Sequence, residues 1–207
     1  MAKEIHLKNH QQTRERISQL AARMIAQDGI QDYAFAKRKA ARQLGVTEIN
    51  NLPGNKEIEQ AVRDYQNLYQ KEEHQVQLQL LRKLAYSYMQ QFEKFNPYLV
   101  GPILNGTATW NSLINLQLVT DNAKDVEMFL LNRQIPYKPG IKRIQVGNEQ
   151  REVPVYALHE EEVAIELAVV SPSDLHAMPK KTSEGEVLER VKLGQLVLLI
   201  EQYEQHL

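Results

Sequence analysis

The chain contains no cysteine, which excludes disulfides, thiolate metal sites and cysteine nucleophiles and is typical of a reducing compartment. No apolar run reaches the roughly 18 residues that a membrane-spanning helix needs, and the polar start MAKEIHLKNHQQTRER lacks the apolar core of a secretory signal. The net charge is close to zero as well, because the chain contains 25 Lys and Arg and 26 Asp and Glu. We therefore expect a cytoplasmic protein that binds no membrane and, lacking any general attraction to polyanions, no nucleic acid.

The first half of the chain has the spacing of helices. With 207 residues and 43% hydrophobic content the chain can bury a full core, and between residues 13 and 95 the apolar residues recur at helical intervals. We predict a first helix that ends at Gly29, a second over 33–44 that ends at Gly45, a third that follows Pro53-Gly54 with Asn55 as its N-cap, and a fourth over 72–95. The sequence thus predicts a helical region over residues 1–96.

After Pro97 the pattern changes from helical to alternating. Strands are predicted over residues 99–104, 113–119, 141–146, 153–158 and 163–170. A helix capped by Asp121 or Asn122 is expected to cross between them, and a last helix is predicted over 183–206. The predicted fold class is α+β, with the helical region, a small mixed sheet over 97–175, and a loop and C-terminal helix over 176–207.

Residues 101–121, GPILNGTATWNSLINLQLVTD, carry a pattern that resembles the nucleotidyltransferase superfamily, which includes polymerase-beta-like and minimal nucleotidyltransferases. The family motif reads G-S-x-x-x-G, several loop residues, then S-D-x-D-L. Gly101 and Gly106 fall on the two glycines, and Ser112 falls on the serine before the acids. The resemblance implies a palm-type sheet with Gly101, Gly106, Thr107 and Ser112 as nucleotide-binding candidates.

The same segment departs from the family at the positions that do chemistry. Pro102 replaces the phosphate-contacting serine, Leu113 the first acid and Asn115 the second, while Glu166 matches the third acid. In the family these acids hold two magnesium ions. Leucine ligates no hard cation and asparagine offers one neutral oxygen, so the metal candidates are Asn115 and Glu166, and the catalytic candidate is Glu166. Magnesium is expected only if transfer activity is retained.

The whole chain also resembles a proteobacterial family that has a basic, alanine-rich early helix, here AKRKAARQLG, and a central VGPILNGTA segment. Its members are sometimes labelled UDP-N-acetylmuramate–alanine ligases. The ATP site of such a ligase needs a G-T-x-G-K-[ST] loop, and residues 106–110 contain neither its second glycine nor its lysine. The label therefore implies no ligase activity for this chain.

Three functions stay open at this point. The first is a nucleotidyltransferase-like binding or regulatory module without metal-dependent transfer, whose partner is a nucleotide or another protein. The second is a residual nucleotidyltransferase that uses Mg-NTP and gathers its metal through Glu166, Asn115 and a relocated acid such as Asp121. The third is a nucleic-acid or protein-interaction module that uses a basic patch on the second helix, formed by Lys37, Arg38, Lys39 and Arg42. A solvated outer helix face explains that patch more simply.

Overall fold

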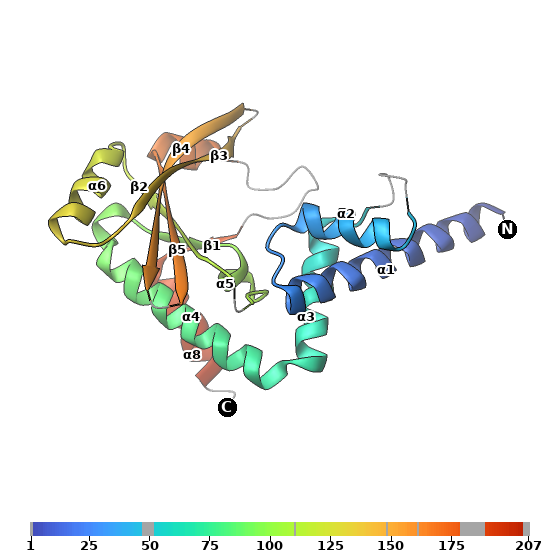
Figure 1. Cartoon of the computed structure of the whole chain (residues 1–207). Helices are drawn as coiled ribbons and strands as arrows, with labels where there is room; N and C mark the ends of the chain where they lie inside the picture. The colour runs from blue at the N-terminus through green and yellow to red at the C-terminus, as the bar shows by residue number, and fades with distance from the viewer. Residues whose placement is uncertain are drawn as a thin grey trace. The chain divides into compact units, whose positions relative to one another are not determined.

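The computed structural model describes residues 2–46, 52–109, 111–147, 149–160, 162–178 and 189–204. The protein is α+β, as the sequence predicts: helices come first, a mixed six-stranded sheet follows, and a helix ends the described chain (Figure 1). The chain forms two compact units, Met1–Gln75 with Thr109–Asn111 and Val76–Ala108 with Ser112–Leu207. We call them the helical unit and the sheet unit.

The helical unit consists of α1 (Ala2–Asp28), α2 (Tyr33–Gln43) and α3 (Asn55–Tyr69). Both α2 and α3 pack against α1, and small side chains on α2 allow a close approach. The buried core is formed by Ile17, Ala21, Ala22, Met24, Ile25, Ala36, Ala40, Ala41, Ile58 and Val62. Gly29 and Gly45 take positive φ values of 69° and 70° after α1 and α2, which confirms the predicted helix ends.

The start of α3 differs from the prediction. The N-cap is Gly54 rather than Asn55, which is the first helical residue. The Glu57 carboxylate accepts a 2.7 Å hydrogen bond from the Gly54 N–H. Glutamate at the third helical position thereby satisfies a donor that would otherwise have no partner in the helix.

The sheet unit contains most of α4 (Lys71–Gln91), the short 3₁₀ helix η2 (Glu93–Phe95) and six strands. The elements after η2 are β1 (Tyr98–Val100), α5 (Pro102–Asn105), β2 (Ile114–Val119), α6 (Ala123–Asn132), β3 (Lys138–Val146), β4 (Glu149–Glu160), β5 (Val163–Val170), α7 (Pro172–Ala177), β6 (Arg190–Val191) and α8 (Leu193–Glu204). The strand order is β3-β4-β5-β2-β1-β6. Only β2 and β5 run parallel among the paired strands described.

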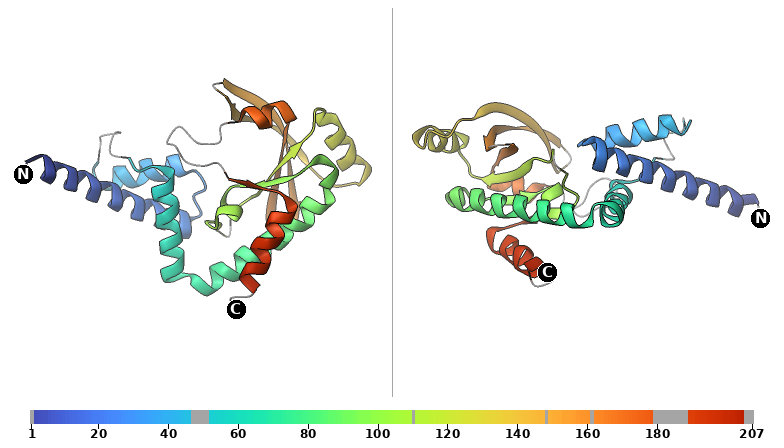
Figure 2. Two further views of the ribbon diagram at one scale, coloured as in Figure 1. Left: turned by 180° about the vertical axis from the view of Figure 1, so that it is seen from behind. Right: turned by 60° about the horizontal axis from the view of Figure 1, so that its bottom comes forward.

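One face of this sheet packs against helices. Ile114, Leu116 and Leu118 alternate as buried residues along β2 and share a core with Phe92 of α4 and Phe129 of α6. In Figure 2 α4 runs along this face of the sheet. The other face therefore receives the intervening residues of each strand.

Three predicted boundaries need correction. The strand predicted over 99–104 is wrong beyond Val100, because Gly101 leaves the extended conformation at φ 79° and Pro102 starts the one-turn helix α5. Residues 76–96, predicted as part of the helical region, pack in the sheet unit through side chains such as Phe92. Of the helix predicted over 183–206, residues 183–188 lie outside the described part, 190–191 form β6, and α8 begins only at Leu193.

Candidate functional site

The sheet brings Asn115 and Glu166 together on the face opposite α4. Asn115 is paired in register with Glu166 on β5 and with Val100 on β1. Paired residues on neighbouring strands lie about 5 Å apart and point to the same side of the sheet. The two metal candidates, which are 51 positions apart in the sequence, are thus neighbours in the fold.

The Glu166 carboxylate forms an ion pair with a lysine. Lys142 Nζ on β3 lies 2.5 Å from Glu166 Oε1, and the Glu166 side chain is only 23% exposed. On this face Lys142 is paired with Val153 and Glu166 with Ala157, and Gly140, Val155 and Ala168 lie between the two pairs. None of these side chains is polar. The charged groups can therefore meet above the sheet, and an ammonium group supplies the positive charge next to Glu166.

Gly101 lies directly against Asn115. A Cβ atom at Gly101 would be 3.3 Å from Asn115 Nδ2, and this amide nitrogen donates a 3.2 Å hydrogen bond to the carbonyl oxygen of Leu113. The glycine is therefore required at this position both for its positive φ and for the close approach of the Asn115 amide.

The remaining nucleotide-binding candidates stabilise their own loop. Gly106 ends α5 in the left-handed conformation at φ 79°. Thr107 is 2% exposed, and its hydroxyl donates a 2.8 Å hydrogen bond to Asn105 Oδ1. Ser112 is buried as well. The glycines thus lie partly at the surface, whereas both hydroxyl groups face the interior.

Arg82 of α4 forms hydrogen bonds with the backbone of the same loop. Its guanidinium group, which is buried, donates to the carbonyl oxygens of Ile103 at 3.2 Å and Leu104 at 3.3 Å. These are carbonyls near the end of α5 that have no partner inside so short a helix. Arg82 therefore fixes α5 on α4 and, through it, the position of Gly101.

Gln117 belongs to this face, although sequence reasoning did not single it out. It lies two residues after Asn115 on β2, in register with Ala168 and Tyr98. Its side-chain Oε1 is buried without a hydrogen-bond partner. A buried acceptor without a donor costs about 1–3 kcal/mol, so this oxygen favours a bound water or a ligand that donates a hydrogen bond. The alternation along residues 113–119 already placed Gln117 on the same side as Asn115.

The basic patch on α2 is smaller than predicted. Lys37 is only 8% exposed, and its Nζ donates a 2.9 Å hydrogen bond to the Pro53 carbonyl oxygen. The prediction that Lys37 faces solvent is therefore wrong, because its aliphatic chain packs in the helical unit while its charged end reaches a carbonyl. Arg38 and Arg42 are exposed and Lys39 is half-buried.

The side chains on this face do not fit a two-magnesium centre. Within the described ranges, no group of three or more His, Cys, Asp or Glu side chains is placed to hold a metal ion. Asp121, the relocated acid considered above, follows the far end of β2, and residues 115 and 119 alone are separated by about 13 Å along the strand. Glu166 is therefore the one carboxylate at the Asn115 position among the residues described.

Comparison with known proteins adds no relative: no protein-family model matches the chain, and no curated protein matches it. In the part of the chain that the structure describes, no helix combines the length and apolarity needed to cross a bilayer. The geometry of the sheet face is therefore the basis for a functional proposal.

Proposed function

We propose that the chain is a nucleotidyltransferase-like protein that performs no metal-dependent nucleotide transfer and acts in the cytoplasm as a binding or regulatory module. The observation that carries this proposal is the pairing of Glu166 with Lys142 beside Asn115. The layout around Gly101 and Gly106 supports the nucleotidyltransferase-like assignment, and the chemistry of the three polar side chains argues against transfer.

Two magnesium ions bring four positive charges and need anionic oxygen ligands at about 2.1 Å. The site offers one carboxylate, and Lys142 already balances its charge. Two unit charges 4 Å apart interact by about 4 kcal/mol at an effective dielectric constant of 20, and a divalent ion beside Glu166 meets roughly twice that repulsion unless Lys142 leaves. Metal binding would therefore have to break an ion pair without gaining a second acid.

The groups that remain are suited to binding. The Glu166 carboxylate on β5 and two amides on β2 lie on neighbouring strands, and the Lys142 ammonium group reaches Glu166 from β3. The buried Gln117 oxygen lacks a donor. Such a set recognises a polar ligand by hydrogen bonds and needs no metal. A nucleotide or a polar segment of another protein provides the required donors and acceptors.

The proposal is tested by a transfer assay combined with a thermal-shift screen. The purified protein is incubated with radiolabelled NTPs and Mg²⁺ or Mn²⁺, and we expect no labelled product. In the screen, a nucleotide that binds, supplied at a concentration 100 times its dissociation constant, should raise the free energy of unfolding by about 2.7 kcal/mol. We expect the same shift of the melting temperature with EDTA as with Mg²⁺.

The control variant is Glu152→Gln, which removes an exposed carboxylate paired with Arg143 at 3.1 Å elsewhere on the sheet. Nucleotide transfer by the wild type that Glu166→Gln abolishes and Glu152→Gln preserves would disprove the proposal.

A further inference from the structure

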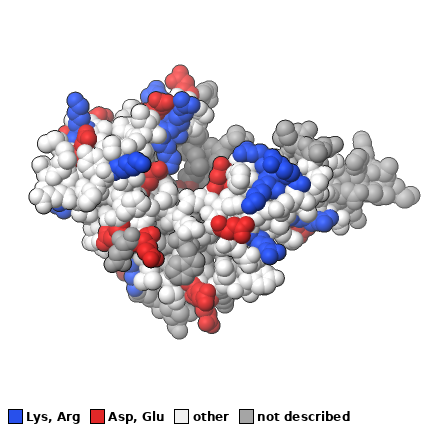
Figure 3. All heavy atoms as spheres, in the orientation of Figure 1, with Lys and Arg blue, Asp and Glu red and all other residues white. Residues whose placement is uncertain are grey.

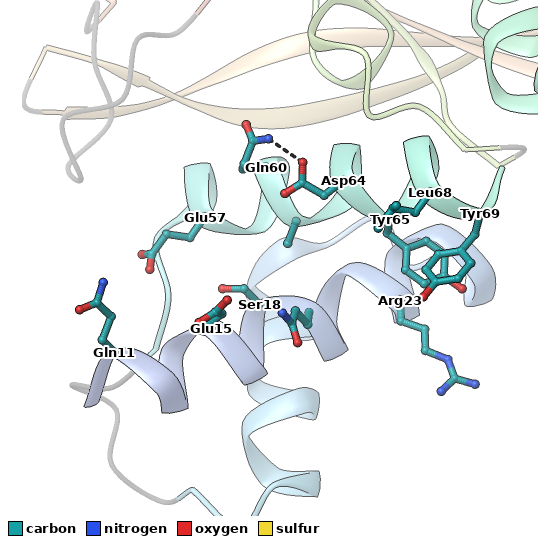
Figure 4. A pocket seen from close by; sticks show the side chains of 12 residues that line it. Gln11, Glu15, Ser18, Arg23, Glu57, Gln60, Asp64, Tyr65, Leu68 and Tyr69 are labelled. Atoms are coloured by element: carbon teal, nitrogen blue, oxygen red, sulfur yellow. Dashed lines mark hydrogen bonds between the residues drawn. The ribbon is translucent and has the colours of Figure 1, made fainter. Parts of the chain in front are cut away.

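A groove of about 760 Å³ runs between α1 and α3 in the helical unit. Figure 4 shows its walls, with Glu15 and Ser18 on α1 and a row from Glu57 to Tyr69 on α3. None of the residues that line this groove takes part in the function proposed for the sheet.

One end of the groove is apolar. The rings of Tyr65 and Tyr69 pack with centroids 4.8 Å apart, and Leu68 and Tyr69 are 76% and 71% exposed. Large apolar side chains this exposed and this close together are characteristic of an interaction surface. A partner that covers this end of the groove should therefore contribute an apolar side chain.

The rest of the groove is acidic. Its lining includes Glu15, Glu57 and Asp64, against Arg23 as the one cation. Arg23 is directed along α1 to Gln27 by a 2.9 Å hydrogen bond. Glu57 is paired with Arg14 at 2.5 Å, whereas Glu15 and Asp64 are exposed. A partner that complements these carboxylates must present cations.

The complementary surface is present on α2 of the same protein. Phe35, Arg38, Lys39 and Arg42 are spaced i, i+3, i+4 and i+7, so they share one face of the helix. Phe35 is 50% exposed, and the three cations follow it along the chain. Figure 3 shows Lys and Arg side chains gathered over α2.

We propose that α2 of one copy of the chain docks in the α1/α3 groove of a second copy. Phe35 packs on Leu68 and Tyr69, and Arg38 and Arg42 face Asp64 and Glu15. Phe35 and Arg38 are about 4.5 Å apart along α2, which is close to the roughly 6 Å between Leu68 and Asp64 along α3, so the apolar contact and the first ion pair can form together. Each copy has both surfaces, and the proposed dimer makes the contact twice about a two-fold axis.

The test is analytical ultracentrifugation of the full chain and two charge-reversed variants. The helix variant is Arg38→Glu with Arg42→Glu, and the groove variant is Glu15→Lys with Asp64→Lys. We expect a dimer for the wild type and at least tenfold weaker self-association for either variant, because each then pairs like charges. An equimolar mixture of the two should dimerise again, since every contact in the mixed dimer is complementary.

The matched control for the helix variant is Lys124→Glu with Lys138→Glu, which likewise replaces two cations by glutamates, at exposed positions of the sheet unit, and should leave the dimer intact. Leu68→Asp should weaken the dimer without any change at a charged position. A wild type that stays monomeric at about 100 µM would overturn the proposal, as would variants that dimerise normally or a mixture that remains monomeric.

Discussion

Replacement of Gly101 by alanine is expected to destabilise the sheet unit. Gly101 has φ 79° and ψ −154°, a backbone conformation that is essentially restricted to glycine and costs other residues about 1–3 kcal/mol. The new Cβ would lie 3.3 Å from Asn115 Nδ2, which is closer than an ordinary contact. The Asn115 amide must then move away from the Leu113 carbonyl, and the loss of that hydrogen bond adds about 1 kcal/mol.

The combined loss for Gly101→Ala is about 2–4 kcal/mol, measured by urea unfolding followed by far-UV circular dichroism. With a denaturant slope of about 2 kcal/mol/M, the midpoint should fall by roughly 1–2 M. The control is Gly194→Ala in α8, where an added Cβ meets no atom within 4 Å and no loss is expected. If Gly101→Ala unfolded at the same urea concentration as the wild type, the reasoning on backbone and contact would be refuted.

Three further variants test other parts of the fold. Leu130→Ala removes a side chain that is fully buried in the sheet core and should cost about 2–5 kcal/mol in urea unfolding; a loss below 1 kcal/mol would contradict that packing. Asn122→Ala removes the cap whose Oδ1 accepts from the Lys124 N–H at 3.2 Å and should cost about 0.5–2 kcal/mol, again by urea unfolding. Burial opposes ionisation of Glu57, but hydrogen bonds from Arg14 and the Gly54 N–H, with the positive charges nearby, hold its pKa below the usual 4.5. Its contribution is therefore present above pH 4.5 and lost as the pH falls through its folded pKa, so the stability difference between wild type and Glu57→Gln should shrink in acid; a constant difference from pH 7 to pH 3 would contradict this.

Local signals in the sequence predicted local structure. Gly29 and Gly45 mark helix ends, and Asn122 marks the start of α6, because each of these features depends on a single residue type at a helix end. The apolar run that begins at Leu99 predicts a single strand, because the pattern of a short apolar run does not distinguish strand from helix. Gly101-Pro102 within that run ends the strand and starts α5.

In the candidate site, too, the sequence predicted only what depends on local pattern. Motif resemblance selected Asn115 and Glu166, and the register places them side by side. Lys142 and Gln117 were not predicted as site residues, because their roles depend on how β3, β4 and β5 pair and on which atoms become buried. Lys37 was misplaced for a related reason: its bond to Pro53 requires the contact between α2 and the segment before α3.

Leu113 and Asn115 stand at two of the three positions where the nucleotidyltransferase motif has carboxylates, and Lys142 is paired with Glu166 at the third. Restoring the acids should reverse this. The variant Leu113→Asp, Asn115→Asp and Lys142→Met places three carboxylates on β2 and β5, and it should bind a divalent ion that the wild type does not.

The most direct measurement is a Mn²⁺ titration followed by electron paramagnetic resonance, which reports free aqueous Mn²⁺. We predict that the wild type leaves Mn²⁺ free up to about millimolar concentration, because the Lys142–Glu166 pair and the single carboxylate give it no site. Tight binding of Mn²⁺ by the wild type, abolished by Glu166→Gln and preserved by Glu152→Gln, would contradict it.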